Sequence, residues 1–328
     1  MPDSPLKEPK VSILMTTYNH EKYIAQAIES VLMQETNFPY ELLVGEDCST
    51  DGTRAIVREY SDKHPEIVHA FFRESNLGSR QNVRQLFWAS RGQYIALLEG
   101  DDYWISRQKL QTQANLLDAH PETTLCGHRS VWRWEDGSQP DRIPGLLAEG
   151  FYELEDILRY LPFHTGTAMF RRVIEDFRPD RYKHLVMGDY PLFVELALRG
   201  NIYVFAEAMG AYRIHAGGTW AAMDPLRRER ESRALFLTLY DRLGEKYRPL
   251  VRYKVFECSY NLGLASFTAG QPGLTRESLN ACLRYSGAFQ FIPQKLRLAC
   301  MGYCGWPLVA WRRFRRALRP SAGSRTRG

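Results

Sequence analysis

The chain has 328 residues, of which 44% are hydrophobic and 25% are charged. These values are typical of a globular protein with a substantial core, and they exclude a disordered or fibrous chain. The formal net charge is +5, but seven arginines and no acid lie in residues 311–328, so subtracting these seven charges leaves −2 for the rest. The basic character therefore belongs to a C-terminal tail, and we expect no nucleic-acid partner.

Signals for export, membrane insertion and zinc binding are absent from the sequence. Residues 1–15 contain prolines and acids where a secretory signal requires a basic start and an apolar stretch. No uninterrupted apolar run of about 20 residues occurs, as a spanning helix would require. The six cysteines form no C-x-x-C pair and the eight histidines no H-x-x-x-H pattern, so we expect no structural zinc. We expect a cytoplasmic protein.

Strands and helices alternate over the first hundred residues. Short apolar runs predict buried strands, and apolar residues at helical spacing predict the helices between them. The expected strands cover residues 11–15, 41–45, 69–73 and 94–98, and the expected helices cover residues 21–34, 53–63 and 79–89. This alternation predicts an α/β fold with a doubly wound sheet that has helices on both faces.

Beyond residue 109 the pattern is mixed. We expect further helices to residue 119 and at 154–161 and 189–198, and further strands at 124–134, 166–170 and 202–212. From residue 225 onwards the pattern is mostly helical. The predicted domains are a sheet domain over residues 1–224, with a first half at about 8–120 and a second half at about 121–224, and a helical C-terminal region with a basic tail over residues 225–328.

Three groups of polar residues follow the first, second and fourth expected strands. They lie in the segments MTTYNHEKYI, GEDCSTDGT and LLEGDDYW. Because ligands bind at the carboxyl ends of strands in open α/β sheets, these segments are expected to converge. Taken alone, each has an ordinary structural explanation, such as a helix cap or a turn. For the third segment, the functional alternative is a divalent cation that is bound by Asp101 and Asp102 and holds a diphosphate. Mg²⁺ typically binds one or two carboxylates and takes its remaining ligands from substrate phosphates and water.

In this order, the three segments resemble those of the family-two glycosyltransferases, which have the nucleotide-diphosphosugar-binding GT-A fold. The resemblance is close over residues 11–117 and looser over residues 166–220. It implies a sugar transferase that uses Mg²⁺ or Mn²⁺ and a nucleotide-diphosphate sugar, with a UDP-sugar favoured. The residues that it assigns to the donor site are Thr16, Tyr18, Glu21, Asp47, Arg80, Asn82 and Asp101.

The same resemblance implies roles for three further residues. Asp102 would be the direct metal ligand, and His215, before a glycine pair, would add a second ligand. Asp189 would be the catalytic base. The position of Asp189 favours the role of a base independently of the resemblance, because Asp189 follows Gly188 and begins a predicted helix. The structural alternative is that Asp189 only caps this helix.

The chain departs from the family pattern at two places. Thr16 stands where members commonly have proline. Glu46, Asp47 and Cys48 stand where they commonly have two aspartates and a glycine. The second departure leaves the geometry of that turn open.

The expected reaction is transfer of a sugar to an acceptor hydroxyl with inversion, in the synthesis of cell-surface polysaccharide or glycolipid. The acceptor would be a saccharide or a lipid-linked saccharide. Two other classes are weighed: a non-catalytic module that binds nucleotide sugars, and a sugar nucleotidyltransferase, which would need a glycine-rich loop after the first strand. A dehydrogenase is a weaker alternative than these two, because no G-x-G-x-x-G follows a strand.

The segment 296–320 mixes tryptophans and other apolar residues with six arginines. Such a segment suits the interface of an anionic membrane, and it equally suits a helix that packs on the body of the protein. The first alternative would place the protein at the inner face of the cell membrane, where lipid-linked acceptors are found.

Overall fold

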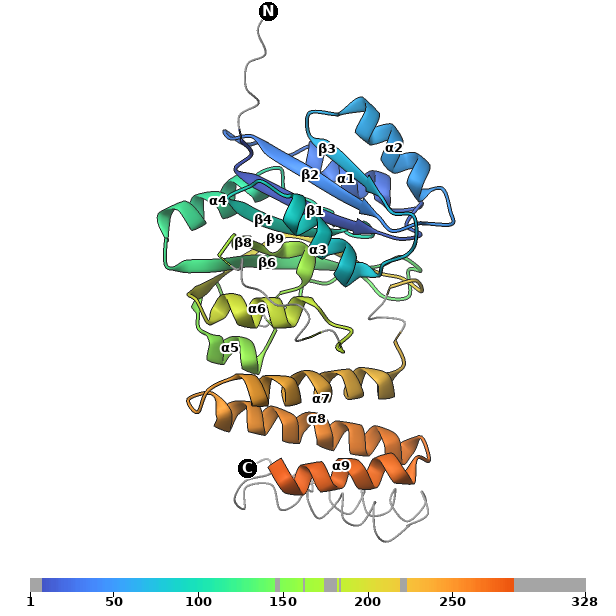
Figure 1. The fold of residues 1–328 in the computed structure, drawn as a ribbon, viewed down its shortest axis with the longest axis vertical. Coiled ribbons are helices and arrows are strands. Elements are labelled where there is room, and N and C mark those ends of the chain that lie inside the picture. The colour runs from blue at the N-terminus through green and yellow to red at the C-terminus, as the bar shows by residue number, and fades with distance from the viewer. Residues whose placement is uncertain are drawn as a thin grey trace, which may run out of the picture. The chain divides into compact units, whose positions relative to one another are not determined.

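The computed structural model describes residues 8–144, 148–161, 163–173, 182, 184–218 and 223–285. The chain divides into two compact units, residues 1–222 and 223–328 (Figure 1). The segment 296–320, for which membrane contact is one expectation, lies outside the described residues. Among the helices of the described part, none combines the length and the apolar character needed to cross a membrane.

The described part of the first unit contains a nine-stranded mixed sheet with the order β3-β2-β1-β4-β8-β6-β9-β5, and β7 pairs with β9. Strands β1 to β4 are parallel, whereas β8 lies antiparallel between β4 and β6. The strands are β1 (Val11–Thr17), β2 (Tyr40–Glu46), β3 (Val68–Phe72), β4 (Tyr94–Glu99), β5 (Tyr103–Trp104), β6 (Thr123–Trp134), β7 (Gly150–Tyr152), β8 (Met169–Arg171) and β9 (Asn201–Ile214).

Helices connect these strands and cover both faces of the sheet (Figure 1). The helices of the first unit are α1 (Ile24–Leu32), α2 (Thr53–Lys63), α3 (Ser79–Ala89), α4 (Lys109–Ala119), α5 (Leu154–Arg159), the 3₁₀ helix η1 (Thr165–Thr167) and α6 (Asp189–Ala197). The expected α/β class and GT-A type sheet are confirmed. The expected strand at 166–170 is wrong at its start, because residues 165–167 form η1 and only residues 169–171 pair in the sheet.

One core cluster lies between the sheet and helices α1, α2 and α4. Side chains of β1 alternate between the two faces, and Val11, Ile13 and Met15 point into this cluster together with Ile28 of α1 and Leu110 of α4. Helix α3 contacts β1 and β2 but contributes no residue to the cluster, so it covers the opposite face. Burial on both faces explains why these strands are continuous apolar runs in the sequence.

The described part of the second unit consists of three helices, α7 (Pro225–Arg242), α8 (Arg248–Thr268) and α9 (Pro272–Tyr285). Helix α7 packs against α8, and α8 against α9. Asp224 caps α7, because its side chain accepts a hydrogen bond from the Arg227 backbone N–H. A small core of Phe256, Leu279 and Cys282 lies between α8 and α9.

Candidate active site

The carboxyl ends of three parallel strands meet at one edge of the sheet. Thr16 of β1 is in register with Gly45 of β2 on one side and with Glu99 of β4 on the other. The backbone N–H of Gly100 donates to the Thr16 carbonyl (2.9 Å). Convergence of the three polar segments, expected from the sequence, therefore occurs.

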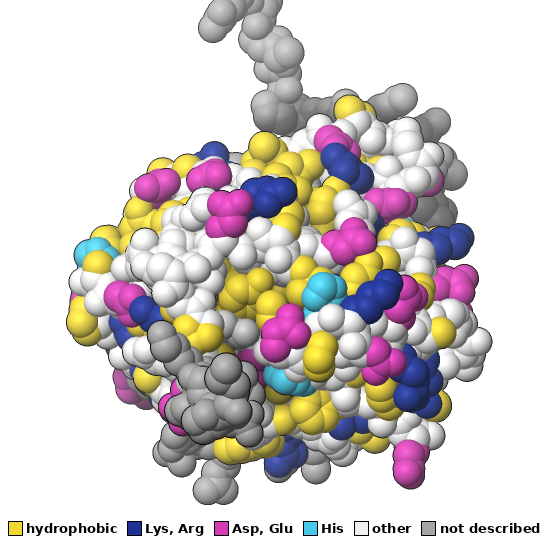
Figure 2. Space-filling model, turned by 90° about the horizontal axis from the view of Figure 1, so that it is seen from above, with side chains coloured by type: hydrophobic (Ala, Val, Ile, Leu, Met, Phe, Trp, Pro, Cys, Tyr) yellow, Lys and Arg dark blue, Asp and Glu magenta, His cyan; other side chains and the backbone are white. Residues whose placement is uncertain are grey.

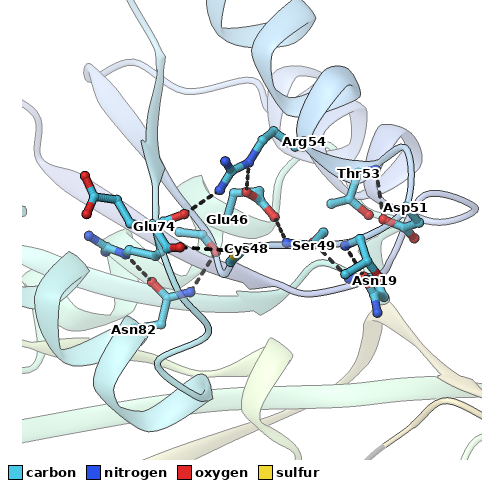
Figure 3. A network of polar contacts seen from close by, with 12 residues as sticks. Asn19, Glu46, Cys48, Ser49, Asp51, Thr53, Arg54, Glu74 and Asn82 are labelled. Carbon is cyan, nitrogen blue, oxygen red and sulfur yellow. Dashed lines mark hydrogen bonds and ion pairs between the residues drawn. The ribbon is translucent and has the colours of Figure 1, made fainter.

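The loop after β1 is bound to the loop after β2 (Figure 3). Asn19 Oδ1 accepts the Thr50 N–H (2.8 Å), and Glu21 Oε2 accepts the Gly52 N–H (2.8 Å). Of the expected donor residues on this loop, Thr16 is half-buried, whereas Tyr18 is 42% exposed. Tyr18 thus has an accessible ring beside the strand ends, while Glu21 supports the neighbouring loop.

The turn after β2 uses a conformation that favours glycine. Cys48 has φ +62°, and its thiol lies 3.5 Å from the Glu74 carbonyl (Figure 3). Glu46 is fully buried and accepts the Ser49 N–H (2.6 Å) and the Arg54 guanidinium (2.5 Å). The two residues that depart from the family pattern thus build the turn: Glu46 anchors it and Cys48 adopts the left-handed conformation.

Asp47 lies at the end of β2, where the resemblance places a contact to the base. Its two carboxylate oxygens accept the backbone N–H groups of Leu77 (2.8 Å) and Gly78 (2.9 Å), so it is the carboxylate that fixes the loop before α3. The side chain is 3% exposed.

Asn82 and Arg80, the two expected donor residues of α3, have structural partners. Asn82 is fully buried, with its amide between the Gly45 carbonyl (2.7 Å) and Arg73 Nε (3.1 Å) (Figure 3), and so has no surface on which a nucleotide could rest. The Arg80 guanidinium donates to the backbone carbonyls of Tyr182, Leu185 and Met187. It therefore holds the segment that leads into α6.

An acidic cluster follows β4. Burial, together with the charges of Asp101 and Asp189, raises the pKa of Glu99 to about 8, and its Oε2 has no hydrogen-bond partner. Burial and the charges of Asp101 and Glu99 also raise the pKa of Asp102. Asp101 differs: burial opposes its charge, but His215 and His20 outweigh that effect and hold its pKa below the ordinary value. Asp101 is therefore the carboxylate of this cluster that stays ionised.

Two histidines face Asp101. His215 Nε2 lies 3.1 Å and His20 Nε2 lies 3.7 Å from Asp101 Oδ2. The Tyr23 ring packs against His215 with 4.7 Å between centroids. Sequence reasoning did not select His20; its place directly after the polar end of β1 was the available signal.

Asp102, the expected direct metal ligand, points toward β9. Its Oδ1 accepts the Arg213 backbone N–H (2.8 Å), and it is 4% exposed. The Arg213 side chain binds the Asp101 carbonyl, Gln26 and Glu135. Asp102 thus links the loop after β4 to β9, and the residue beside His215 is Asp101.

Asp189 is the first residue of α6, after the N-cap Gly188. Its Oδ1 accepts the Tyr190 N–H (2.8 Å), and its Oδ2 accepts the Thr165 hydroxyl (2.8 Å). A Cβ atom on Gly166 would lie 3.3 Å from Glu99 Oε2, so glycine lets this backbone approach the acidic cluster. Asp189 is half-buried and therefore accessible, and Thr165 fixes the orientation of its carboxylate.

A divalent cation could be held at this site if the substrate supplied part of its ligands. Within the described part of the chain, no group of three or more His, Cys, Asp or Glu side chains could hold a metal without help. Asp101 and His215 supply one oxygen and one nitrogen, which leaves positions for the phosphates and water that Mg²⁺ and similar ions retain. A resident protein-only metal site is thus absent from the described residues.

On the face that Figure 2 shows, the described Lys and Arg side chains alternate with acidic and hydrophobic ones. That face has no continuous basic area of the kind that binds nucleic acids.

Several proteins of known sequence are similar to this chain. Rv1520 of Mycobacterium tuberculosis is 35% identical over 210 residues, which cover 64% of this chain and 60% of that protein. EpsE of Bacillus subtilis, a putative glycosyltransferase by name, is 30% identical over 214 residues, 61% of this chain and 72% of EpsE. WfgD of Escherichia coli, a UDP-Glc:alpha-D-GlcNAc-diphosphoundecaprenol beta-1,3-glucosyltransferase, is 40% identical over 121 residues, 37% of this chain and 46% of WfgD.

The fold has relatives among solved structures. TarS of S. aureus (residues 1–349, with UDP-GlcNAc) superposes with a TM-score of 0.64 at 19% identity, over 89% of this chain and 87% of TarS. A mannosyltransferase of Pyrobaculum calidifontis, with GDP-Man and Mn²⁺, superposes with a TM-score of 0.55 at 17% identity, over 94% and 83%. At these identities the likeness concerns the fold.

A family model settles the classification. Glycosyl transferase family 2 matches residues 12–177, about half of the chain and most of the sheet domain described above. The chain spans 60% of the length of its mycobacterial relatives. From this match, the GT-A type sheet and the converging acids, we conclude that the chain belongs to glycosyl transferase family 2.

Proposed function

We propose that this protein transfers a sugar from a nucleotide-diphosphate donor to an acceptor hydroxyl, with inversion at the anomeric carbon, in the synthesis of a cell-surface polysaccharide or glycolipid. The observation that carries the proposal is the position of Asp189. Its carboxylate is oriented by Thr165, and both Asp189 and Asp101, the partner of His215, are close enough to Glu99 to raise its pKa. A base and a proposed phosphate-binding group thus belong to one acidic cluster.

We infer that the nucleotide lies over the ends of β1 and β2. Tyr18 offers an exposed ring there, and Thr16 and Glu21 line the same edge. Asp47, Arg80 and Asn82 contribute indirectly, because their side chains bind the backbone of neighbouring segments. A UDP-sugar is the favoured donor, because WfgD and TarS are named or shown with uridine nucleotides. The archaeal neighbour contains GDP-Man, so the base requires a direct test.

We assign the cation, Mg²⁺ or Mn²⁺, to Asp101 and His215. When bound, it would neutralise negative charge on the leaving diphosphate. Asp102 then acts as a positioning residue, because its carboxylate fixes β9 just before His215. This assignment moves the direct metal contact from Asp102, where the family resemblance places it, to Asp101.

Asp189 is the general base of the proposed reaction. It accepts the proton of the attacking acceptor hydroxyl as that oxygen forms a bond to the anomeric carbon and the bond to the diphosphate breaks. General-base assistance of this kind contributes about 10²–10⁴ in rate. Burial keeps the Glu99 carboxyl protonated near pH 7, which limits the negative charge between Asp189 and Asp101.

Calorimetric titration with UDP, GDP and dTDP, each with Mn²⁺ and with EDTA, tests the donor site. We expect one of the three nucleotides to bind only when the metal is present. In a second assay, the protein should slowly hydrolyse the nucleotide sugar that contains the same nucleotide. Binding without hydrolysis or transfer would favour the non-catalytic module. Absence of binding to all three would refute the donor site itself.

A further inference from the structure

Four aromatic rings from three segments form a continuous surface, here called the aromatic surface: Trp132 and Trp134 of β6, Tyr212 of β9, and His164. The His164 and Tyr212 centroids are 4.2 Å apart, and Trp132 lies 6.0 Å from Tyr212 and 6.4 Å from Trp134. All four side chains are only partly buried. The rings therefore present accessible apolar area next to one another.

The aromatic surface adjoins the proposed base. His164 directly precedes Thr165, whose hydroxyl binds Asp189, and the charge of Asp189 acts on the His164 ring. Burial lowers the pKa of His164 to about 4, so the ring is neutral at pH 7. Its Nε2 lies 3.3 Å from the Ser130 hydroxyl. A molecule that reaches Asp189 from this side thus meets uncharged rings.

Arg142 lies at the far end of this surface. Its backbone pairs with Trp132 in both directions, N–H to carbonyl (2.8 and 3.2 Å). Its guanidinium carbon lies 5.1 Å from the Trp132 centroid and 4.9 Å from the Trp134 centroid. The backbone bridge and the two indoles fix the position of this cation.

No carboxylate among the described residues neutralises Arg142, although acids are close in sequence. Asp141 binds Arg133 (2.7 Å), and Glu135 binds Arg213 (3.1 Å). Asp136 accepts the backbone N–H of Ser138 (2.9 Å). The local acids are thus engaged elsewhere, and the exposed Arg142 guanidinium has no acidic partner in the described part of the chain.

We propose that the aromatic surface and Arg142 form the acceptor subsite, and that the acceptor is a saccharide with a phosphate group near its accepting sugar. This inference rests on the proposed function. The sugar would place its apolar face on the rings with one hydroxyl at Asp189, and the phosphate would bind the guanidinium. Arginine suits this role because its planar fork matches phosphate oxygens in a bidentate manner.

Charge argues for an anionic group at this position. Asp101 of the proposed reaction centre stays ionised, so an acceptor phosphate placed there, without the cation that accompanies the donor diphosphate, would be repelled. Arg142 is separated from Asp189 by the rings of Trp132 and His164. The arrangement therefore suits an acceptor whose phosphate lies apart from the hydroxyl that reacts.

The test is a binding measurement in the presence of saturating UDP and Mn²⁺, which occupy the donor site. The probes are hexyl glycosides of N-acetylglucosamine, glucose and galactose, each with and without a diphosphate between sugar and hexyl chain, and a ribitol-phosphate trimer. The last distinguishes a phosphodiester polymer from a diphosphate-linked lipid. We expect one phosphate-bearing probe to bind wild-type protein at least about tenfold more tightly than the uncharged hexyl glycosides.

Two variants make the test specific. In Arg142→Gln the preference for the phosphate-bearing probe should fall to less than about twofold, because the charge-assisted contact is lost. Arg58→Gln is the matched control, since Arg58 is another exposed arginine stacked on an aromatic ring (Phe72, 4.6 Å) on α2. It should keep the preference unchanged. Trp132→Leu should weaken all bound probes that carry a sugar ring.

The inference is overturned if no phosphate-bearing probe binds, if charged and uncharged glycosides bind equally, or if Arg142→Gln retains the preference. Failure of the proposed function gives a different result. In that case the wild-type protein would neither bind nor hydrolyse a nucleotide sugar, whatever the acceptor probes do. A far-UV circular dichroism spectrum and a thermal unfolding midpoint equal to those of the wild type show that Arg142→Gln is folded.

Discussion

His215 Nε2 lies 3.1 Å from Asp101 Oδ2, although 114 residues separate the two in sequence. The contact joins the loop after β4 to the end of β9. The same loop is also fixed by Asp102, which accepts the backbone N–H of Arg213 (2.8 Å). One aspartate thus contacts a histidine side chain, and the next supports the backbone.

Replacement of Asp101 or His215 tests the cation assignment. Asp101→Asn and His215→Ala should each weaken Mn²⁺-dependent UDP binding by at least about tenfold, because each removes a proposed ligand. Calorimetry in Mn²⁺ and in EDTA measures the effect. His120→Ala is the control, since His120 also lies 3.1 Å from an acid, Glu122, outside the site. Unchanged metal dependence in both site variants would contradict the assignment.

Asp189→Asn tests the proposed base. The amide keeps the size of the side chain but cannot accept the proton, so kcat for transfer should fall about 10²–10⁴-fold with donor affinity unchanged. Thr165→Val should give a smaller loss, since only the orienting bond to Oδ2 disappears. Steady-state kinetics of both variants, with Asp62→Asn on α2 as the control, separates these effects. Full transfer by Asp189→Asn would exclude the base role.

Arg80→Gln distinguishes donor binding from support of α6. Because the guanidinium binds the carbonyls of Tyr182, Leu185 and Met187, we expect kcat to fall about tenfold while the affinity for UDP stays within twofold. Arg84→Gln, one turn further along α3, is the matched control. A selective loss of nucleotide affinity in Arg80→Gln would instead support the role expected from the sequence.

The turn at Cys48 predicts a gain in stability. Cys48→Gly removes a side chain from φ +62°, which should raise the free energy of unfolding by about 0.5–1 kcal/mol after the entropy cost of glycine. Asn19 has φ +56°, but its Oδ1 accepts the Thr50 N–H (2.8 Å). Asn19→Gly should therefore lose about 1 kcal/mol. Urea denaturation of both variants checks the opposite signs.

Lys109 predicts a pH-dependent stability. It is fully buried over the Trp104 ring, its Nζ has no hydrogen-bond partner, and burial lowers its pKa to about 7. The unfolded chain keeps this proton up to the ordinary pKa of 10.5. Between pH 7 and 10.5 the unfolded state thus binds more protons, so this lysine makes stability rise with pH by roughly 1 kcal/mol per unit.

Lys109→Met removes that contribution. The variant should exceed wild type in stability most at pH 7 and below, and the difference should shrink as the pH rises toward 10. Thermal unfolding at a series of pH values measures this difference in stability. Lys63→Met is the control, because the Lys63 side chain is exposed and pairs with Glu59. An equal difference at every pH would show that Lys109 keeps its proton in the folded state, so that its pKa is not lowered.

Local patterns in the sequence determined the elements and the edge at which the site lies. Apolar runs specify strands that are buried on both faces, and helical spacing specifies the helices; α2 and α3 begin and end at the expected residues. Parallel strands place their carboxyl ends at one edge, so the convergence of Thr16, Asp47 and Glu99 follows from the order of elements alone.

Only the tertiary structure decided what the individual side chains do. Asp101 and Asp102 are neighbours of one chemical type, and the turn that they occupy sends one toward His215 and the other toward Arg213. Asn82 became buried because α3 lies against β2, and Arg80 meets a segment about 100 residues away. The physical reason is that sequence spacing fixes the direction of a side chain within its own element, whereas its partner depends on how elements distant in the chain pack.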